Sequence, residues 1–176
     1  MAEDRSFSSL HGARPPEGLP GAPNRKGVAY TGPFGPAFGW HADSYRTELI
    51  GVAFGSASVG WGASGVRGSR RKALRAGMAG EIAGRPVRIS RRRAGWSREA
   101  RALRIDFEDR VYSYRLRKWT QHWLDRGDEV GVIRRRAVEG EVLEGADAWD
   151  VAIFALLQAS GLEREVEFRP LLFLFL

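Results

Sequence analysis

The 176-residue sequence contains no cysteine, which excludes disulfide bonds, thiolate-bound zinc and cysteine nucleophiles. Histidine is scarce as well, and its three residues form no recognisable catalytic or metal-binding pattern with the carboxylates. The chain also lacks a serine within a G-x-S-x-G motif. We therefore predict no catalytic residue, no metal site and no cofactor, and an enzyme is the less favoured class of protein.

Long apolar runs are missing, because no stretch approaches the roughly 20 residues of a membrane-spanning helix. Glu3 and Asp4 stand where a secretion signal carries positive charge, and no apolar segment follows them. These features predict a soluble protein without a transmembrane segment. We expect it in the cytoplasm, with a peripheral position at the membrane as the alternative.

Lysine is rare, so that arginine supplies most of the formal net charge of +7. An excess of basic residues favours an anionic partner, although an arginine-rich composition also fits a compositional bias of the coding sequence. Basic residues gather between Arg67 and Lys118, where tryptophan is interleaved with them. Guanidinium groups match phosphate oxygens, and tryptophan suits a nucleobase or a membrane interface.

This composition predicts a non-enzymatic binding module whose basic face meets an anionic lipid head group or a phosphorylated ligand. A nucleic-acid-binding protein is the first alternative, because the same arginines would contact its phosphates. The predicted ligand-binding residues are Arg91, Arg92, Arg93, Trp96, Arg115, Arg117 and Lys118.

Composition also divides the chain into two parts. Residues 1–25 are rich in proline and glycine, which predicts a disordered tail. Residues 26–176 carry the patterns of a single β-rich domain. Apolar and charged residues alternate over 102–109 and 111–119, which predicts an antiparallel hairpin that turns at 109–110. Further strands are predicted over 47–54, 86–90, 120–135 and 139–144.

The strongest helical pattern lies near the C-terminal end of the sequence. Asp147 is a good N-cap, Asp150 follows in the first turn, and Gly161 is a natural stop. The helix predicted over 148–160 is apolar on nearly every side, with Gln158 and Asp150 as its polar exceptions. At about 20 Å it is too short to cross a bilayer, so protein must bury it. We therefore expect a mainly β fold, with an antiparallel sheet curled or closed into a barrel around this one hydrophobic helix.

The charged hairpins followed by EVLEGADAWDVAIFALLQASGL (141–162) resemble the C-terminal part of the tubby-like superfamily, which includes the LURP-one-related proteins and the phospholipid scramblases. The resemblance covers residues 86–161. It implies a closed β-barrel threaded by a hydrophobic helix, and it supports lipid binding because some members bind phosphoinositides. The N-terminal half does not match. The lipidated cysteines and the calcium segment of scramblases have no counterpart here.

A glycine-rich segment offers a second alternative function. Residues 60–65 match the G-x-G-x-x-G motif of dinucleotide-binding folds, and Glu81 follows about 20 residues later, where a ribose-binding acid is expected. A nucleotide-dependent enzyme would use this segment to hold phosphate. Glycine recurs often here and the later chain is antiparallel in pattern, so a flexible or bulged connection is the alternative interpretation.

Residues 168–176 end in six consecutive apolar side chains, 171–176, with no charged side chain after Pro170. An exposed segment of this kind would be prone to aggregation as a strand. We therefore expect it to pack within the domain or to mediate self-association with a second subunit.

Overall fold

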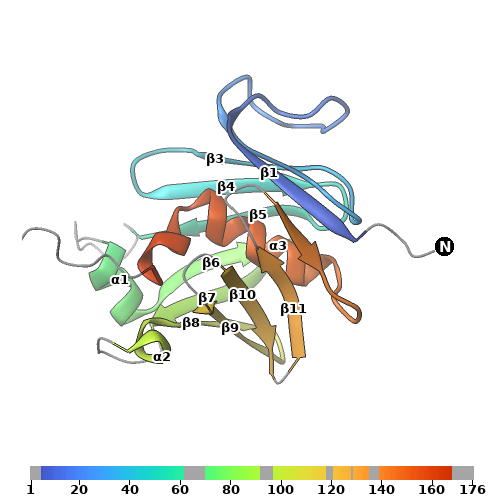
Figure 1. Cartoon of the computed structure of the whole chain (residues 1–176). Coiled ribbons are helices and arrows are strands. Elements are labelled where there is room, and N and C mark those ends of the chain that lie inside the picture. The colour runs from blue at the N-terminus through green and yellow to red at the C-terminus, as the bar shows by residue number, and fades with distance from the viewer. Residues whose placement is uncertain are drawn as a thin grey trace, which may run out of the picture.

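A computed structural model describes residues 5–61, 70–91, 97–117, 121–127, 129–134 and 139–167. These residues form twelve antiparallel strands, each paired with the next one in the sequence (Figure 1). The last strand pairs with the first, which closes the sheet into a barrel and confirms the predicted mainly β class. The strands are β1 (Ser6–Ala13), β2 (Gly27–Thr31), β3 (Ala37–His41), β4 (Arg46–Gly51), β5 (Gly55–Gly60), β6 (Met78–Ile82), β7 (Arg85–Arg91), β8 (Leu103–Phe107), β9 (Arg110–Arg117), β10 (Gln121–Arg126), β11 (Glu129–Arg134) and β12 (Glu139–Val142).

The first strand corrects the expected disordered tail. β1 pairs with both β2 and β12, so it is the strand that closes the barrel. Phe7 and Ser9 are buried on its inner face. The sequence pattern did not predict this strand, because Phe7 is its only large inward side chain and a proline-rich stretch follows. The prediction of disorder is therefore wrong for residues 6–13, and the barrel begins within the supposed tail.

The predicted hairpin is confirmed as β8 and β9, but its turn lies at 108–109 instead of 109–110. Ile105 pairs with Tyr112, and Glu108 adopts a left-handed φ of 54° in the turn. Both turn positions keep the same apolar residues on the buried face. Alternation alone therefore could not distinguish one turn from the other.

The strand predicted over 47–54 ends earlier, and the glycine-rich part of the chain forms a strand of its own. β4 ends at Gly51, a turn follows, and β5 begins at Gly55 with a positive φ of 77°. Residues 55–60 are therefore not a flexible connection, and 62–65 lie outside the described residues. β5 pairs antiparallel with β4 and with β6. A dinucleotide motif requires a parallel βαβ unit, and β5 lacks the parallel partner that such a unit needs.

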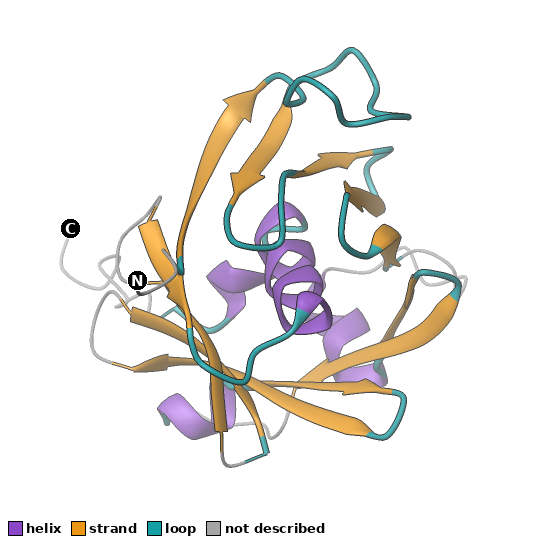
Figure 2. Ribbon diagram, turned by 90° about the vertical axis from the view of Figure 1, so that its right-hand side faces the viewer, coloured by secondary structure: helices purple, strands orange, loops and turns teal. Residues whose placement is uncertain are grey.

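Three α-helices and one 3-10 helix accompany the barrel in the described part of the chain. They are α1 (Arg70–Ala76), α2 (Arg98–Arg101), α3 (Ala148–Ala159) and η1 (Leu162–Glu165). α3 contacts strands from widely separated parts of the sheet, β2 to β5 together with β10 and β11. Figure 2 shows strands on several sides of α3.

Nine of the twelve residues of α3 are buried, as the apolar pattern of this helix predicts. Phe154 illustrates its surroundings. The ring of Phe154 lies 5.3 Å from the ring of Phe7 on β1 and 5.9 Å from that of Tyr114 on β9, measured between centroids. One side chain of α3 thus packs against strands far apart in the sequence, and the hydrophobic core includes α3 as well as the inner face of the sheet.

The predicted start of α3 is confirmed, and the helix ends at Ala159, one residue before the predicted end at residue 160. Asp147 is the N-cap, and its side chain accepts hydrogen bonds from the backbone N–H groups of Trp149 and Asp150. Asp150 completes a capping box, since its Oδ2 accepts the Asp147 N–H at 3.0 Å. At the other end, Gly161 adopts a left-handed φ of 69°, which glycine tolerates and which ends the helix.

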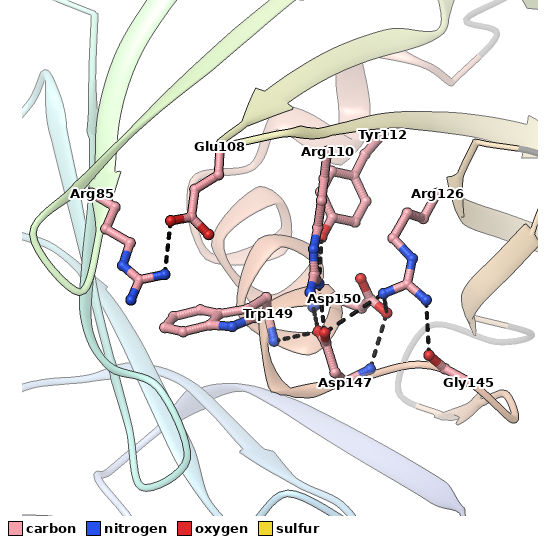
Figure 3. A network of polar contacts seen from close by, with 9 residues as sticks. All are labelled: Arg85, Glu108, Arg110, Tyr112, Arg126, Gly145, Asp147, Trp149 and Asp150. Atoms are coloured by element: carbon pink, nitrogen blue, oxygen red, sulfur yellow. Dashed lines mark hydrogen bonds and ion pairs between the residues drawn. The ribbon is translucent and has the colours of Figure 1, made fainter.

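A polar network holds the start of α3 against the strands (Figure 3). Arg110 of β9 donates to Asp147. Arg126 of β10 lies 3.4 Å from Asp150 Oδ2 through Nη1 and donates to the Gly145 carbonyl at 2.9 Å. Burial raises the pKa of Asp150. Burial alone would also raise the pKa of Asp147, but hydrogen bonds from Arg110 and the backbone lower it below its ordinary value.

The closest approach of α3 to the sheet gives a first prediction. A methyl group added at Gly39 of β3 would lie 2.4 Å from the Cβ of Ala159. We expect Gly39→Ala to lower the free energy of unfolding by about 1–3 kcal/mol, because the overpacked contact must shift the helix or the strand. In a double-mutant cycle measured by urea unfolding, Ala159→Gly should relieve part of this loss.

Gly60→Ala is the matched control for that cycle, since the nearest atom to a methyl group there is the Tyr45 carbonyl oxygen at 3.5 Å. It should change the free energy of unfolding by less than about 1 kcal/mol. Additive effects of Gly39→Ala and Ala159→Gly would show that β3 and α3 do not touch at this point.

Candidate functional site

Two of the predicted ligand-binding arginines are engaged within the protein. Arg91 Nη2 donates to the backbone carbonyl of Glu165 at 2.9 Å. Arg115 Nε lies 2.6 Å from Asp125 Oδ2, and the Asp125 side chain is almost fully buried. A buried carboxylate that loses its cation becomes strongly destabilising, so Arg115 has a structural role of its own.

Of the other predicted ligand-binding residues, the structure describes Arg117 alone. The guanidinium carbon of Arg117 lies 4.1 Å from the centroid of the Trp123 ring, a cation–π contact. Arg92, Arg93, Trp96 and Lys118 lie outside the described residues. The described part of the chain therefore does not bring the seven residues together as a set, and their role stays a prediction.

A different basic site lies beside the C-terminal end of α3. There a cavity of about 300 Å³ is lined by the end of β1, the start of β2 and the loop before it, the end of β3, the first residue of α1, the last turn of α3 and η1. We call this cavity the mouth pocket and define it by the residues that carry the argument below. They are Lys26, Trp40, His41, Arg70, Gln158 and Arg164.

The mouth pocket carries an excess of positive charge. Lys26, Arg70 and Arg164 line it, whereas Glu163 is the one carboxylate that lines it among the described residues. Glu163 is itself buried and takes part in interactions within the protein. The electrostatic potential inside the cavity is therefore favourable for an anion.

Arg70 is the most constrained of these cations. Its guanidinium carbon lies 4.7 Å from the centroid of the Trp61 ring, and Nη1 lies 3.5 Å from the carbonyl oxygen of Gly161. Burial lowers the pKa of Arg70; the nearby Glu165 carboxylate opposes this effect, and the Arg164 charge adds to it. Arginine remains protonated at neutral pH even so. A partly desolvated cation of this kind gains more from an anion than an exposed one does.

His41 adds a polar ring to the wall of the pocket. Its Nδ1 lies 2.9 Å from Thr47 Oγ1, which fixes the orientation of the imidazole. Burial, followed by the charge of Arg70, lowers the pKa of His41. The ring is therefore neutral near pH 7 and offers a hydrogen bond without a full charge.

Gln158 is the least expected member of the site. It belongs to the last turn of α3 and is only 1% exposed, yet neither Oε1 nor Nε2 has a hydrogen-bond partner in the described part of the chain. A buried amide left unsatisfied costs about 1–3 kcal/mol. The sequence marks Gln158 as a polar exception on an apolar helix, and this was the one signal that could have pointed to the site.

A second polar group on β9 and β10 has a structural role instead. The Tyr114 hydroxyl lies 2.9 Å from His122 Nδ1, and His122 Nε2 lies 3.5 Å from Glu167 Oε1. This order of carboxylate, imidazole and hydroxyl has the components of an acid–base relay. Tyr114 is fully buried, however, and it does not line the mouth pocket. The group satisfies polar atoms inside the barrel wall.

Comparison of the chain with models of protein families, with curated proteins and with solved structures gives no match. The resemblance to the tubby-like superfamily therefore stays a prediction. No helix in the described ranges is long and apolar enough to cross a membrane. Within the same ranges, no group of three or more histidine, aspartate or glutamate residues is arranged to hold a metal ion. Any functional assignment thus depends on the geometry of the site itself.

Proposed function

We propose that the protein is a non-enzymatic binding module that holds a small phosphorylated ligand in the mouth pocket. In this proposal the barrel closes around α3 as its single hydrophobic central helix, and the last turn of α3 forms the floor of the site. The observation that carries the proposal is the excess of cations in the cavity, with Arg70 partly desolvated among them.

The chemistry of the pocket supports a phosphate group in particular. The guanidinium of Arg70 presents a fork of donors that matches phosphate oxygens, and Lys26 and Arg164 add positive charge. The C-terminal end of a helix carries partial negative charge, which would repel an anion. The contact between Arg70 and the Gly161 carbonyl offsets that charge at the floor of the pocket.

The proposal is tested with methyl phosphate as the probe and isothermal titration calorimetry as the measurement. Arg70→Met removes the charge-assisted hydrogen bonds and should weaken binding at least about tenfold, which corresponds to about 1.4 kcal/mol. Arg104→Met is the matched control, because Arg104 pairs with Asp106 on the outer face of β8 and lies outside the mouth pocket. It should leave the affinity unchanged.

The same variants separate a soluble ligand from the other anionic partners. Flotation with vesicles of phosphatidylcholine, with and without about one-fifth phosphatidylserine, tests a lipid surface. A steep salt dependence in fluorescence polarisation with single-stranded DNA would favour the nucleic-acid alternative. Absence of methyl phosphate binding to the native protein, or equal binding by Arg70→Met and Arg104→Met, would overturn the proposed function.

A further inference from the structure

We infer that the ligand of the mouth pocket carries a hydrogen-bond donor and an acceptor side by side, close to its anionic group, and that Gln158 binds this pair. The inference rests on the proposed function and adds the chemical class of the ligand to it. It is carried by the buried and unsatisfied amide of Gln158, which lines the cavity.

The amide of Gln158 makes two complementary demands. Oε1 accepts hydrogen bonds, and Nε2 donates them from the same plane. A phosphate group that is fully ionised only accepts, so it can satisfy Nε2 and leaves Oε1 without a partner. A ligand that satisfies both atoms therefore presents a donor next to an acceptor.

The protein residues around Gln158 do not meet these demands. Gly39, Ala159 and Gly161 line the same part of the pocket, and none of them has a polar side chain. Arg70 cannot satisfy Oε1 in the described structure, since its Nη1 is directed to the Gly161 carbonyl and no contact to Gln158 is present. Each of the two amide atoms exposes less than 1 Å², so a ligand in the cavity reaches them when the Gln158 side chain turns toward it.

Two kinds of ligand supply such a pair beside a phosphate. Neighbouring hydroxyl groups of a sugar phosphate offer both donor and acceptor, and so does the edge of a nucleobase, to which glutamine side chains bind in a bidentate manner. The cavity of about 300 Å³ is at the lower end of the range for small-molecule sites. Trp40 and His41 also line the cavity, which adds aromatic side chains to its wall.

A nested series of ligands tests the inference by calorimetry. Methyl phosphate carries the anion alone, ribose 5-phosphate adds neighbouring hydroxyls, and adenosine 5′-monophosphate adds a base edge. We expect at least one of the two larger ligands to bind about tenfold more tightly than methyl phosphate, or better. Whichever member first shows the gain identifies the source of the donor and acceptor pair.

The matched variant is Gln158→Met, which keeps the length of the side chain and removes both polar atoms. It should erase the gain of the larger ligand, and any loss of affinity for methyl phosphate should be smaller than that loss, because methyl phosphate lacks the donor that Oε1 needs. Without ligand, its melting temperature should equal or exceed that of the native protein, because the variant no longer buries an unsatisfied amide.

Two outcomes would overturn the inference while the proposed function stands: equal affinities across the series, or a gain that survives in Gln158→Met. The second outcome would mean that other residues of the pocket bind the groups that the larger ligand adds. If the native protein does not bind methyl phosphate, the proposed function fails as well. The experiment therefore distinguishes failure of the inference about Gln158 from failure of the proposed phosphate binding.

Discussion

Phe154→Asp is expected to abolish the folded state. Phe154 is 2% exposed and contacts Phe7 and Tyr114 on separate strands, so its loss alone should cost about 3–5 kcal/mol. The variant also buries a carboxylate with no cation beside it, which adds several kcal/mol or forces the group to become neutral. The sum is comparable to the net stability of a typical domain, about 5–15 kcal/mol. Circular dichroism during heating should show no cooperative transition.

Val52→Asp is the control for this substitution. Val52 lies in the turn between β4 and β5 and is 62% exposed, so the same new charge stays in water. Its melting temperature should remain within a few degrees of the native value. A soluble Phe154→Asp protein with an unchanged melting curve would show that α3 does not lie in the core.

Local patterns were sufficient for much of the fold. The ends of α3 follow from Asp147 and Gly161, because capping and left-handed stops depend on neighbours in the sequence. The β8 and β9 hairpin follows from alternation for the same reason. β1 was missed because its evidence is not local. It is held by pairing with β12, which lies at the other end of the chain, and its own residues have weak strand propensity.

The candidate site was harder to predict from the sequence than the fold was. Arg91 and Arg115 belong to the basic segment on which the prediction of a ligand-binding site was based. In the folded protein Arg91 contacts a backbone carbonyl and Arg115 contacts a buried carboxylate. Lys26, Arg70 and Gln158 are far apart in the sequence, and the closed barrel brings them to one cavity. A run of basic residues gives the net charge of a segment. It does not show which charges remain available after folding.

The network at the start of α3 gives a prediction about pH. Arg126 lies 3.4 Å from the Asp150 carboxylate, and the Asp150 side chain is 1% exposed. In Arg126→Met that buried carboxylate loses its nearby cation, which should lower the free energy of unfolding by about 3 kcal/mol near pH 7. Arg104→Met removes an exposed ion pair to Asp106 and should cost less than about 1 kcal/mol. Urea unfolding measures both values.

The sign of the pH effect follows from the direction of each pKa shift. Burial raises the pKa of Asp150 in the folded state, so the folded protein binds the proton more readily than the unfolded chain does. The cost of the charged carboxylate is thus present above the folded pKa, and it is relieved as the pH falls toward the unfolded value of about 3.9. Removal of Arg126 raises the folded pKa further, so the relief begins at a higher pH.

Asp147 responds in the opposite direction, because its folded pKa is lowered. Its contribution is present above the unfolded value of about 3.9 and is lost only as the pH falls through the lower folded pKa, so it stays constant between about pH 7 and pH 5. The deficit of Arg126→Met relative to the native protein should therefore shrink by roughly 1 kcal/mol over that interval. Adding Asp150→Asn should remove this pH dependence, since the asparagine keeps an acceptor for the Asp147 N–H and carries no charge. A deficit that stays constant from about pH 7 to pH 5 would mean that Arg126 stabilises the start of α3 through its contacts with the Gly145 carbonyl and the Asp147 carboxylate and not through the Asp150 charge.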